Sequence, residues 1–330
     1  MFFLSIIIPV YNEADNVRPL FEKIQTVCQT IGDGYEVLFI DDGSMDETFT
    51  VLSELSELEP QLAVIRFKEN AGQTAAMAAG FEFAEGQRII SMDGDLQNDP
   101  SDIPALLAKL DEGYDLVCGW RKERQDKFVT RRIPSIVANW IIGKVTGVPI
   151  HDNGCSLKAY RASIIKQVPL YGEMHRFIPA MSTVAGARIA EIVVTHHPRH
   201  LGKSKYGLGR IWRVMLDIIA FQLIISVFRQ GSNSLKRFLP KWGKLARFFM
   251  FQCKRRPLRV FGPFSTMGFT LGSILLIGLS KTNTMVGASI LLIGGGILAF
   301  CFGLFGELVS FANAKHVKDY KVKTFLRRKK

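Results

Sequence analysis

The stretch Ser91-Met92-Asp93-Gly94-Asp95-Leu96-Gln97 directly follows the apolar, strand-like run 88–90 and sets two carboxylates one residue apart. Hard divalent cations such as Mg²⁺ and Mn²⁺ prefer oxygen ligands, and Mg²⁺ usually takes one or two protein carboxylates together with substrate phosphates. An Asp-x-Asp at the end of a strand therefore suits one cation held against a diphosphate. A turn with solvated aspartates around Gly94 is the simpler alternative, because Asp and Gly are common turn residues.

Short β-rich runs alternate with amphipathic stretches over the first 120 residues. The expected strands are 3–9, 36–41, 62–67, 88–92 and 115–119. After the first of them, apolar residues recur at helical spacing, at Val17, Leu20, Phe21, Ile24 and Val27. This alternation predicts a doubly wound α/β sheet.

Polar clusters follow three of the expected strands, at residues 11–13, 41–44 and 93–95. Doubly wound sheets bind ligands in the crevice beyond the carboxyl ends of their strands. Any one cluster could be a capped turn, but three such clusters after three strands are expected to meet at one edge. The sequence therefore predicts a ligand site there.

Beyond residue 120, basic and His-bearing loops replace the regular pattern. Clustered Arg and Lys suit phosphate binding, with solvated loop charge as the alternative for any single residue. The adjacent His196 and His197 have no Cys or His at ligand spacing, so a zinc site is not indicated. The five cysteines are scattered and without CxxC spacing, which indicates no disulfide framework.

Two uncharged apolar runs, 260–280 and 285–306, are each about as long as the ~20 residues that a helix needs to cross a bilayer. We interpret them as transmembrane helices joined by the polar turn 281–284. A pair of buried helices in a soluble protein is the alternative. Several glycines in both runs would let the helices approach closely.

The positive charge flanks these runs. The chain has a net charge of +12, yet residues 231–260 carry nine Lys or Arg and no acid, and residues 315–330 carry a net +7. Such charge fixes orientation and attracts anionic headgroups, which predicts cytoplasmic flanks and argues against nucleic acid as a partner. The stretches 210–228 and 241–251 mix aromatic, aliphatic and basic residues, as interfacial amphipathic helices do.

On these residues the chain resembles family 2 glycosyltransferases of the GT-A fold, and more narrowly the polyprenyl-phosphate glycosyltransferases. The first 207 residues carry the resemblance. The matching motifs are 5–13, 41–44, 70–73, 93–97, 152–161, 176–179 and 202–206. A two-helix anchor follows as in the bacterial members, but the basic-aromatic segment near 231–252 is longer than their pattern.

The resemblance implies roles for individual residues. Pro9, Tyr11 and Glu13 would line the nucleotide-base pocket, with Asp42 near the base or ribose. Asp93 and Asp95 would hold Mg²⁺ or Mn²⁺ and the diphosphate, and Gln97 of the same motif joins the nucleotide-binding set. The candidates for contacting the acceptor phosphate or the donor diphosphate are Arg121, Arg132, Arg176, Lys203 and Lys205.

Asp152 is the usual base candidate of the family. A phosphate monoester, however, carries about −1.5 to −2 charge at pH 7, so its attacking oxygen is already deprotonated. Asp152 is therefore either a base or a group that orients Arg, Lys or sugar hydroxyls. The metal and the basic set would supply what the reaction needs, namely the positioning of two anions and stabilisation of the leaving diphosphate.

The resulting hypothesis is inverting transfer of a hexose from a nucleotide-diphosphate sugar, UDP-glucose-like or GDP-mannose-like, to undecaprenyl or dolichyl phosphate. Its domains would be a cytoplasmic catalytic domain, juxtamembrane helices, two transmembrane helices of the inner membrane and a basic cytoplasmic tail: 1–207, 208–259, 260–314 and 315–330. Homo-oligomers are compatible with this reading. The alternatives are a polysaccharide synthase, whose Gln-x-x-Arg-Trp motif is missing from the sequence, and a catalytically silent membrane scaffold.

Overall fold

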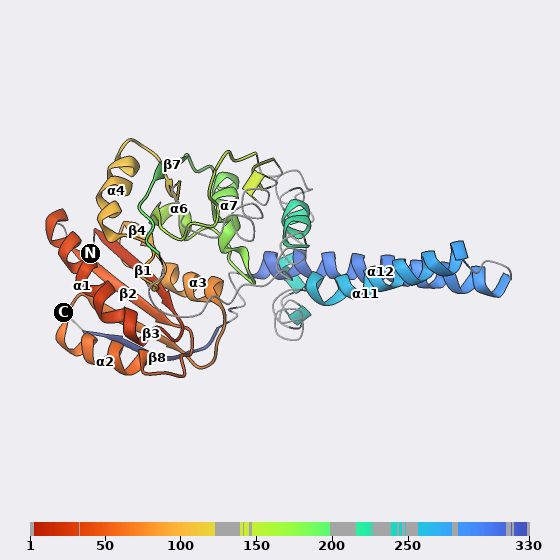
Figure 1. Cartoon of the computed structure of the whole chain (residues 1–330), viewed down its shortest axis with the longest axis horizontal. Coiled ribbons are helices and arrows are strands. Elements are labelled where there is room, and N and C mark those ends of the chain that lie inside the picture. Colours follow the sequence, from red (N-terminus) through yellow and green to blue (C-terminus); the bar gives the residue numbers. More distant parts are fainter. Residues whose placement is uncertain are drawn as a thin grey trace. The chain divides into compact units, whose positions relative to one another are not determined.

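The chain divides into two compact units in the computed structural model (Figure 1). Unit 1 comprises residues 1–206 and 320–330, and unit 2 comprises residues 207–319. The structure describes residues 3–32, 34–122, 139–140, 142–144, 147–198, 216–224, 226, 239–242, 244–245, 248, 257–278, 283–314, 318 and 320–328.

Unit 1 is built on one mixed sheet of eight strands in the order β7-β5-β6-β4-β1-β2-β3-β8. The strands are β1 (Leu4–Val10), β2 (Tyr35–Asp41), β3 (Leu62–Phe67), β4 (Arg88–Ser91), β5 (Leu116–Trp120), β6 (Lys158–Arg161), β7 (Ile189–Val193) and β8 (Val322–Arg327). The central strand β1 pairs in parallel with both β2 and β4, whereas β6 and β8 run antiparallel to their neighbours. The strand order reverses beside β1, which makes the gap between β1 and β4 the topological switch point.

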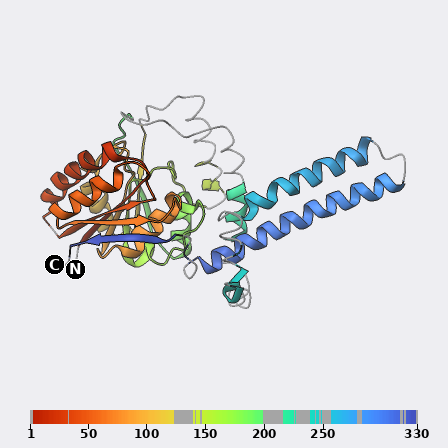
Figure 2. The same ribbon diagram turned by 90° about the horizontal axis from the view of Figure 1, so that it is seen from below.

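Helices cover both faces of this sheet (Figures 1 and 2). One face packs against α1 (Ala14–Ile31), α2 (Thr48–Leu58) and α4 (Ile103–Asp111), whose apolar residues share a buried cluster with Ile6 and Ile8 of β1. The other face carries α3 (Gln73–Phe83), where Gly80 lies close to Ile7 and Ile40. The 3.6-residue spacing of apolar residues in α1 thus produces the predicted buried stripe.

Besides the helical residues 139–140 and 142–144, the described part of unit 1 contains four short helices. They are η1 (Pro100–Asp102), α6 (Ala162–Ile165), η3 (Met174–Phe177) and α7 (Ile178–Val184).

The five strands predicted from sequence are present, with ends shifted by one residue or none. The strands β6, β7 and β8 were not predicted. β6 has only four residues, Lys-Ala-Tyr-Arg, and β7 and β8 contain charged residues, so none of them has the apolar run that marks a central strand.

The carboxyl-terminal residues require a correction to the predicted domains. Residues 315–330 were expected as a separate basic tail, yet β8 forms the edge of the unit 1 sheet, antiparallel to β3. Tyr320 stacks on Phe67 with ring centroids 4.8 Å apart, and its hydroxyl donates to Glu82 at 2.6 Å. Long-range pairing with β3 therefore orders a sequence whose charge alone indicates a solvated tail.

Arg327 of β8 supplies the counter-charge for a buried carboxylate. Its Nη2 lies 2.7 Å from Oε2 of Glu36, whose side chain is 2% exposed, and its Nη1 pairs with Glu85. The other oxygen of Glu36 accepts from the Ser5 hydroxyl at 2.5 Å and from the backbone N–H of Glu85 at 2.7 Å. β8 thus completes a polar network that includes Ser5 of β1 and Glu36 of β2.

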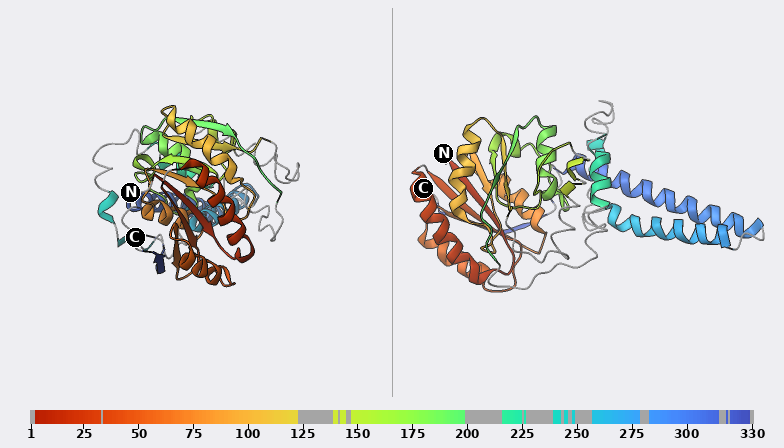
Figure 3. Two further views of the ribbon diagram at one scale, coloured as in Figure 1. Left: turned by 90° about the vertical axis from the view of Figure 1, so that its left-hand side faces the viewer. Right: turned by 45° about the horizontal axis from the view of Figure 1, so that its top comes forward.

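Unit 2 contains an apolar hairpin of two long helices that run side by side (Figure 3). The helices are α11 (Pro257–Gly278) and α12 (Asn283–Asn313), and both are long and apolar enough to cross a membrane. A Cβ added at Gly268 would lie 2.8 Å from the Leu292 carbonyl oxygen, so glycine permits the close contact. The predicted turn 281–284 overlaps α12, because Asn283 and Thr284 already belong to that helix.

Polar contacts organise one end of this hairpin. Arg259 of α11 forms a two-pronged ion pair with Asp217, at 3.1 and 2.5 Å, and Asp217 belongs to the helical residues 216–224. The buried Glu307 of α12 accepts from the backbone N–H of Leu258 at 3.2 Å, so a carboxylate faces the first turn of α11. The 3₁₀ helix η4 (Leu239–Trp242) adds an edge-on contact between Trp242 and Phe305.

We predict that Arg327→Met destabilises unit 1 by roughly 2–3 kcal/mol, because it leaves the buried Glu36 carboxylate without its cation. Arg328→Met is the matched control, since Arg328 is the next residue and is exposed. Thermal unfolding of the purified full chain in detergent measures both variants. Equal melting temperatures for the two would show that β8 does not stabilise the sheet.

Candidate active site

The three polar clusters lie on neighbouring strands at one edge of the sheet. Val10, the last residue of β1, is in register with Asp41 at the end of β2, and Ile7 of β1 is in register with Ser91 at the end of β4. The segments that follow β1, β2 and β4 therefore leave the sheet around the switch point. The structure places the clusters as the strand order requires.

The segments after β1 and β2 are tied together. Asn12 has a positive φ of 56°, unusual for a residue other than glycine, and its side-chain oxygen accepts from the Met45 N–H at 2.9 Å. In return the Asn12 N–H donates to the Ser44 hydroxyl at 3.0 Å. Glu13 directly precedes α1 as its N-cap residue, and its carboxylate accepts from the Asn16 side chain at 2.5 Å. Hydrogen bonds thus fix the turn that contains the candidate base-pocket residues Tyr11 and Glu13.

Asp42 fixes a further segment of this edge. Its two carboxylate oxygens accept the backbone N–H groups of Ala71 at 2.6 Å and Gly72 at 2.8 Å. Gly43 has a φ of +72°, and a Cβ there would lie 2.8 Å from the Glu69 carbonyl carbon. Only glycine fits this approach, so the chain from β2 and the chain before α3 pass each other at van der Waals distance.

The first turn of α3 joins two candidate motifs. Gln73 donates from its side-chain amide to Oδ1 of Asp93 at 2.8 Å. Next to it, the Thr74 hydroxyl and Nδ1 of His175 lie 2.8 Å apart, which ties η3 to α3. Arg176 follows in η3 and is half-buried. The helix therefore links the Asp-x-Asp segment with the segment that carries Arg176.

The Asp-x-Asp segment has a constrained backbone. Leu96 has a positive φ of 61°, and a Cβ on Gly94 would lie 2.6 Å from a Val10 methyl group. Burial and the neighbouring charge of Asp95 raise the pKa of Asp93, while Ser156, Arg121 and Lys158 act in the opposite direction. The pKa of Asp93 is raised on balance, so its ionised form is disfavoured, chiefly by burial and then by the charge of Asp95.

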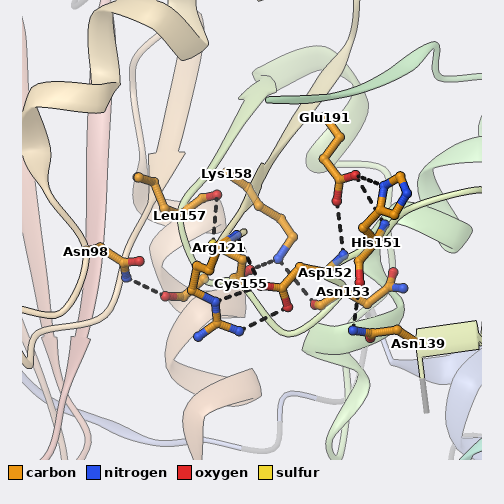
Figure 4. Close-up of polar contacts among 11 residues, drawn as sticks. Asn98, Arg121, Asn139, His151, Asp152, Asn153, Cys155, Leu157, Lys158 and Glu191 are labelled. Carbon is orange, nitrogen blue, oxygen red and sulfur yellow. Dashed lines mark hydrogen bonds and ion pairs between the residues drawn. The ribbon is translucent and has the colours of Figure 1, made fainter. Parts of the chain in front are cut away.

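Arg121, directly after β5, forms a two-pronged ion pair with Asp152 (Figure 4). Its Nε lies 2.7 Å from Oδ2 and its Nη2 lies 3.0 Å from Oδ1, and Asp152 is 3% exposed. Burial alone would lower the pKa of Arg121, but the hydrogen bonds and the charge of Asp152 outweigh it, and the pKa is raised. The guanidinium is therefore a permanent cation held in one orientation.

Lys158, the first residue of β6, is a buried cation that the sequence analysis does not single out. Its Nζ donates to the carbonyl oxygens of Cys155 and Asn153. It is 3% exposed, and its charge reaches Asp93. A lysine in an antiparallel strand has no distinctive sequence signal, because its role depends on carbonyl groups three and five residues earlier.

The chain after β7 returns to the Asp-x-Asp segment. The backbone N–H of His197 donates to the Gln97 carbonyl at 2.8 Å, and the Gln97 side chain donates back to the His197 carbonyl at 3.4 Å. Nε2 of His197 lies 2.7 Å from Oδ2 of Asp99. Gln97 thus anchors the segment that leads toward Lys203 and Lys205. Those two lysines and Arg132 lie outside the described residues.

Asp93 and Asp95 fit a divalent cation that completes its coordination shell with substrate oxygens and water. Within the part of the chain that the structure describes, no group of three or more His, Cys, Asp or Glu side chains gathers as a metal site. Two neighbouring carboxylates, one of them with a raised pKa, are nonetheless stabilised by an added positive charge. One or two carboxylates are what Mg²⁺ usually takes from a protein at phosphate sites.

We predict that Gly43→Ala lowers stability by roughly 1–3 kcal/mol, because an added Cβ meets backbone atoms and the residue has a positive φ. Gly34→Ala is the control, since a Cβ at Gly34 meets no atom within 4 Å. Thermal unfolding measures both variants. A Gly43→Ala protein as stable as Gly34→Ala would contradict the close passage of the two segments.

Comparison with known proteins identifies the family. The family model described as Glycosyl transferase family 2 matches residues 5–168. Dodecaprenyl-phosphate galacturonate synthase of Rhizobium johnstonii is 39% identical over 324 residues, which cover 93% of this chain and 87% of that protein. Undecaprenyl-phosphate 4-deoxy-4-formamido-L-arabinose transferase of Klebsiella pneumoniae is 41% identical over 217 residues, 66% of each chain.

A solved structure agrees in fold. Glucosyl-3-phosphoglycerate synthase from Mycobacterium tuberculosis, in complex with Mn²⁺ and UDP-glucose, superposes with a TM-score of 0.51 over 67% of this chain and 78% of that one. The sequence identity is 15%, so this likeness concerns the fold alone. From the family model and the relative that matches nearly end to end, the chain belongs to glycosyl transferase family 2 and is a glycosyltransferase.

Proposed function

We propose that this enzyme transfers a sugar from a nucleotide-diphosphate donor to a polyprenyl phosphate at the cytoplasmic face of the membrane. The observation that carries the proposal is the Arg121–Asp152 pair, a buried and oriented guanidinium whose charge reaches Asp93. Arg121 would thus offer a fixed cation to a second anion, beside the place where Asp93 and Asp95 would hold a metal cation. The two named relatives act on dodecaprenyl and undecaprenyl phosphate, and an apolar hairpin suits such an acceptor.

The donor would occupy the edge formed by the segments after β1, β2 and β4. Pro9, Tyr11 and Glu13 would face the base, and Asp42 would act chiefly by holding residues 71 and 72 in place. Asp93 and Asp95 would hold Mg²⁺ or Mn²⁺, which would stabilise the charge of the departing nucleoside diphosphate. We favour a hexose or a related sugar as the transferred group, by analogy with one relative named for galacturonate, a six-carbon sugar acid, and another named for 4-deoxy-4-formamido-L-arabinose, a five-carbon sugar.

The acceptor phosphate needs cations more than it needs a base. Its attacking oxygen is ionised near neutral pH, because the second pKa of a phosphate monoester is near 6. Both oxygens of Asp152 are engaged by Arg121, so we assign Asp152 the orienting role and not that of the base. Arg121 and Arg176, with Arg132, Lys203 and Lys205, would bind the acceptor phosphate or the donor diphosphate.

The side of the membrane on which unit 1 would lie is inferred from charge and from the connectivity of the chain. β8 follows the hairpin in sequence but pairs with β3 in the sheet of unit 1, so both ends of the hairpin lead to the same unit. The strongly basic residues 231–260 and 315–330 then put that side in the cytoplasm. The inner membrane would thus present the site to cytosolic nucleotide sugars.

We predict that Asp93→Asn and Asp95→Asn each lower sugar transfer by at least 100-fold, since each removes a ligand that holds the cation against the diphosphate. Asp111→Asn is the control, because Asp111 is an exposed carboxylate paired with Arg88. Purified protein is assayed with a panel of labelled nucleotide sugars and undecaprenyl phosphate, with Mg²⁺, Mn²⁺ or EDTA. Full turnover in EDTA would refute metal dependence, and no transfer from any donor by the wild type would refute the proposed reaction.

We predict that a cysteine at Asn283 reacts with an impermeant thiol reagent in intact cells and that a cysteine at Lys323 reacts only after lysis. Asn283 is exposed at the start of α12, and Lys323 is exposed on β8. The variants are made in a background without Cys253 and Cys301, because Cys301 is exposed. Labelling of Lys323→Cys in intact cells would overturn the orientation.

A further inference from the structure

Glu191 lies in the middle of β7, outside every motif that marks the site in sequence. Its side chain is 11% exposed and accepts three hydrogen bonds from two neighbouring residues (Figure 4). Oε1 accepts the backbone N–H of Asp152 at 3.0 Å, and Oε2 accepts the backbone N–H of His151 at 3.2 Å and faces Nδ1 of its ring at 2.7 Å. A single carboxylate therefore fixes two consecutive peptide groups.

Those peptide groups carry the partner of Arg121. Asp152 reaches the guanidinium with both carboxylate oxygens, so the direction of its side chain sets the direction of Arg121. Glu191 lies in β7, in register with Cys118 of the parallel strand β5, and Arg121 directly follows β5. A continuous chain of contacts therefore runs from Glu191 on β7, through the backbone and the carboxylate of Asp152, to Arg121 just beyond β5.

From this chain of contacts we infer that Glu191 is a positioning residue for Arg121. It acts through the backbone of Asp152, and the inference rests on the proposed function, in which Arg121 binds a phosphate. A carboxylate is required at this position because it offers only acceptors. Glutamine would turn an NH₂ group toward one of the N–H donors and leave a donor unpaired, which is costly at a buried site.

A second anchor holds the same loop from the other side. The Lys158 ammonium binds the carbonyl oxygens of Asn153 and Cys155, the residues that follow Asp152. Acceptors on β7 hold the N–H groups at the start of the loop, and a donor on β6 holds the carbonyls beyond it. Such support from rigid strands is what keeps a charged side chain within a few tenths of an ångström of its working position.

A double-mutant cycle separates positioning from a general structural role. Glu191→Gln is expected to lower kcat/KM about 30-fold and Arg121→Met about 1,000-fold, whereas the double variant is no more than about threefold below Arg121→Met. Additive losses would overturn the inference, because they would show that Glu191 acts independently of Arg121. If Glu191→Gln does not fold, Glu191→Asp replaces it, since the shorter side chain keeps the charge but withdraws from the Asp152 N–H.

His151→Ala is the matched comparison. It removes the imidazole contact with Glu191 but keeps the backbone N–H groups of residues 151 and 152. We expect its kcat/KM to stay within about fivefold of the wild type. A loss as large as that of Glu191→Gln would overturn the inference by showing that the pair acts through the imidazole ring and not through the backbone.

Amide hydrogen exchange tests the contact without reference to the reaction. Exchange at the amides of His151 and Asp152 is expected to accelerate at least tenfold in Glu191→Gln, because both amides donate to Glu191, and to remain protected in the exposed-site control Asp111→Asn. Unchanged exchange would overturn the positioning role whichever reaction is catalysed. Sugar transfer by the wild type, measured in parallel, separates a failure of the proposed function from a failure of this inference.

Discussion

The crowding of negative charge at one sheet edge is the constraint that organises unit 1. The strand order brings five carboxylates to the same edge of the sheet: Asp41, Asp42, Asp93, Asp95 and Asp152. Three of them are compensated by the protein itself. Arg66 lies 3.4 Å from Asp41, two backbone N–H groups bind Asp42, and Arg121 pairs with Asp152. Buried carboxylates are tolerated only with such partners.

At the Asp93 and Asp95 pair, burial and like charge still disfavour the ionised form of Asp93. The pKa of Asp93 remains raised by burial and by Asp95 although Ser156, Arg121 and Lys158 all favour its ionised form. A bound cation would relieve this repulsion, and a diphosphate would bring the oxygens that complete its shell. Because Arg66 and Arg121 already pair with Asp41 and Asp152, an external cation would find its most favourable place at Asp93 and Asp95.

Much of this arrangement could be predicted from sequence, because the central strands are apolar runs and their polar ends are local signals. The 93–95 motif and Asp152 with Arg121 carry side chains whose types suggest their chemistry. Glu191 and Lys158 could not be found in this way, since each acts on backbone groups brought near by β7 and β6. β8 could not be predicted for a related reason. Its sequence is basic and partly exposed, and its order as a strand depends on pairing with β3.

The return of β8 to unit 1 also constrains how the hairpin can cross a membrane. Residues 1–206, which precede the hairpin, and residues 320–330, which follow it, belong to one folded unit, and such a unit cannot lie on both sides of a bilayer. The chain must therefore cross an even number of times, and the two helices α11 and α12 meet that condition. In the proposed topology the basic flanks would select the side of the membrane, and the pairing of β8 with β3 would keep both flanks on that side. The Arg327–Glu36 pair therefore has a topological as well as a structural consequence, because it joins the chain beyond the second helix to the strands that begin the fold.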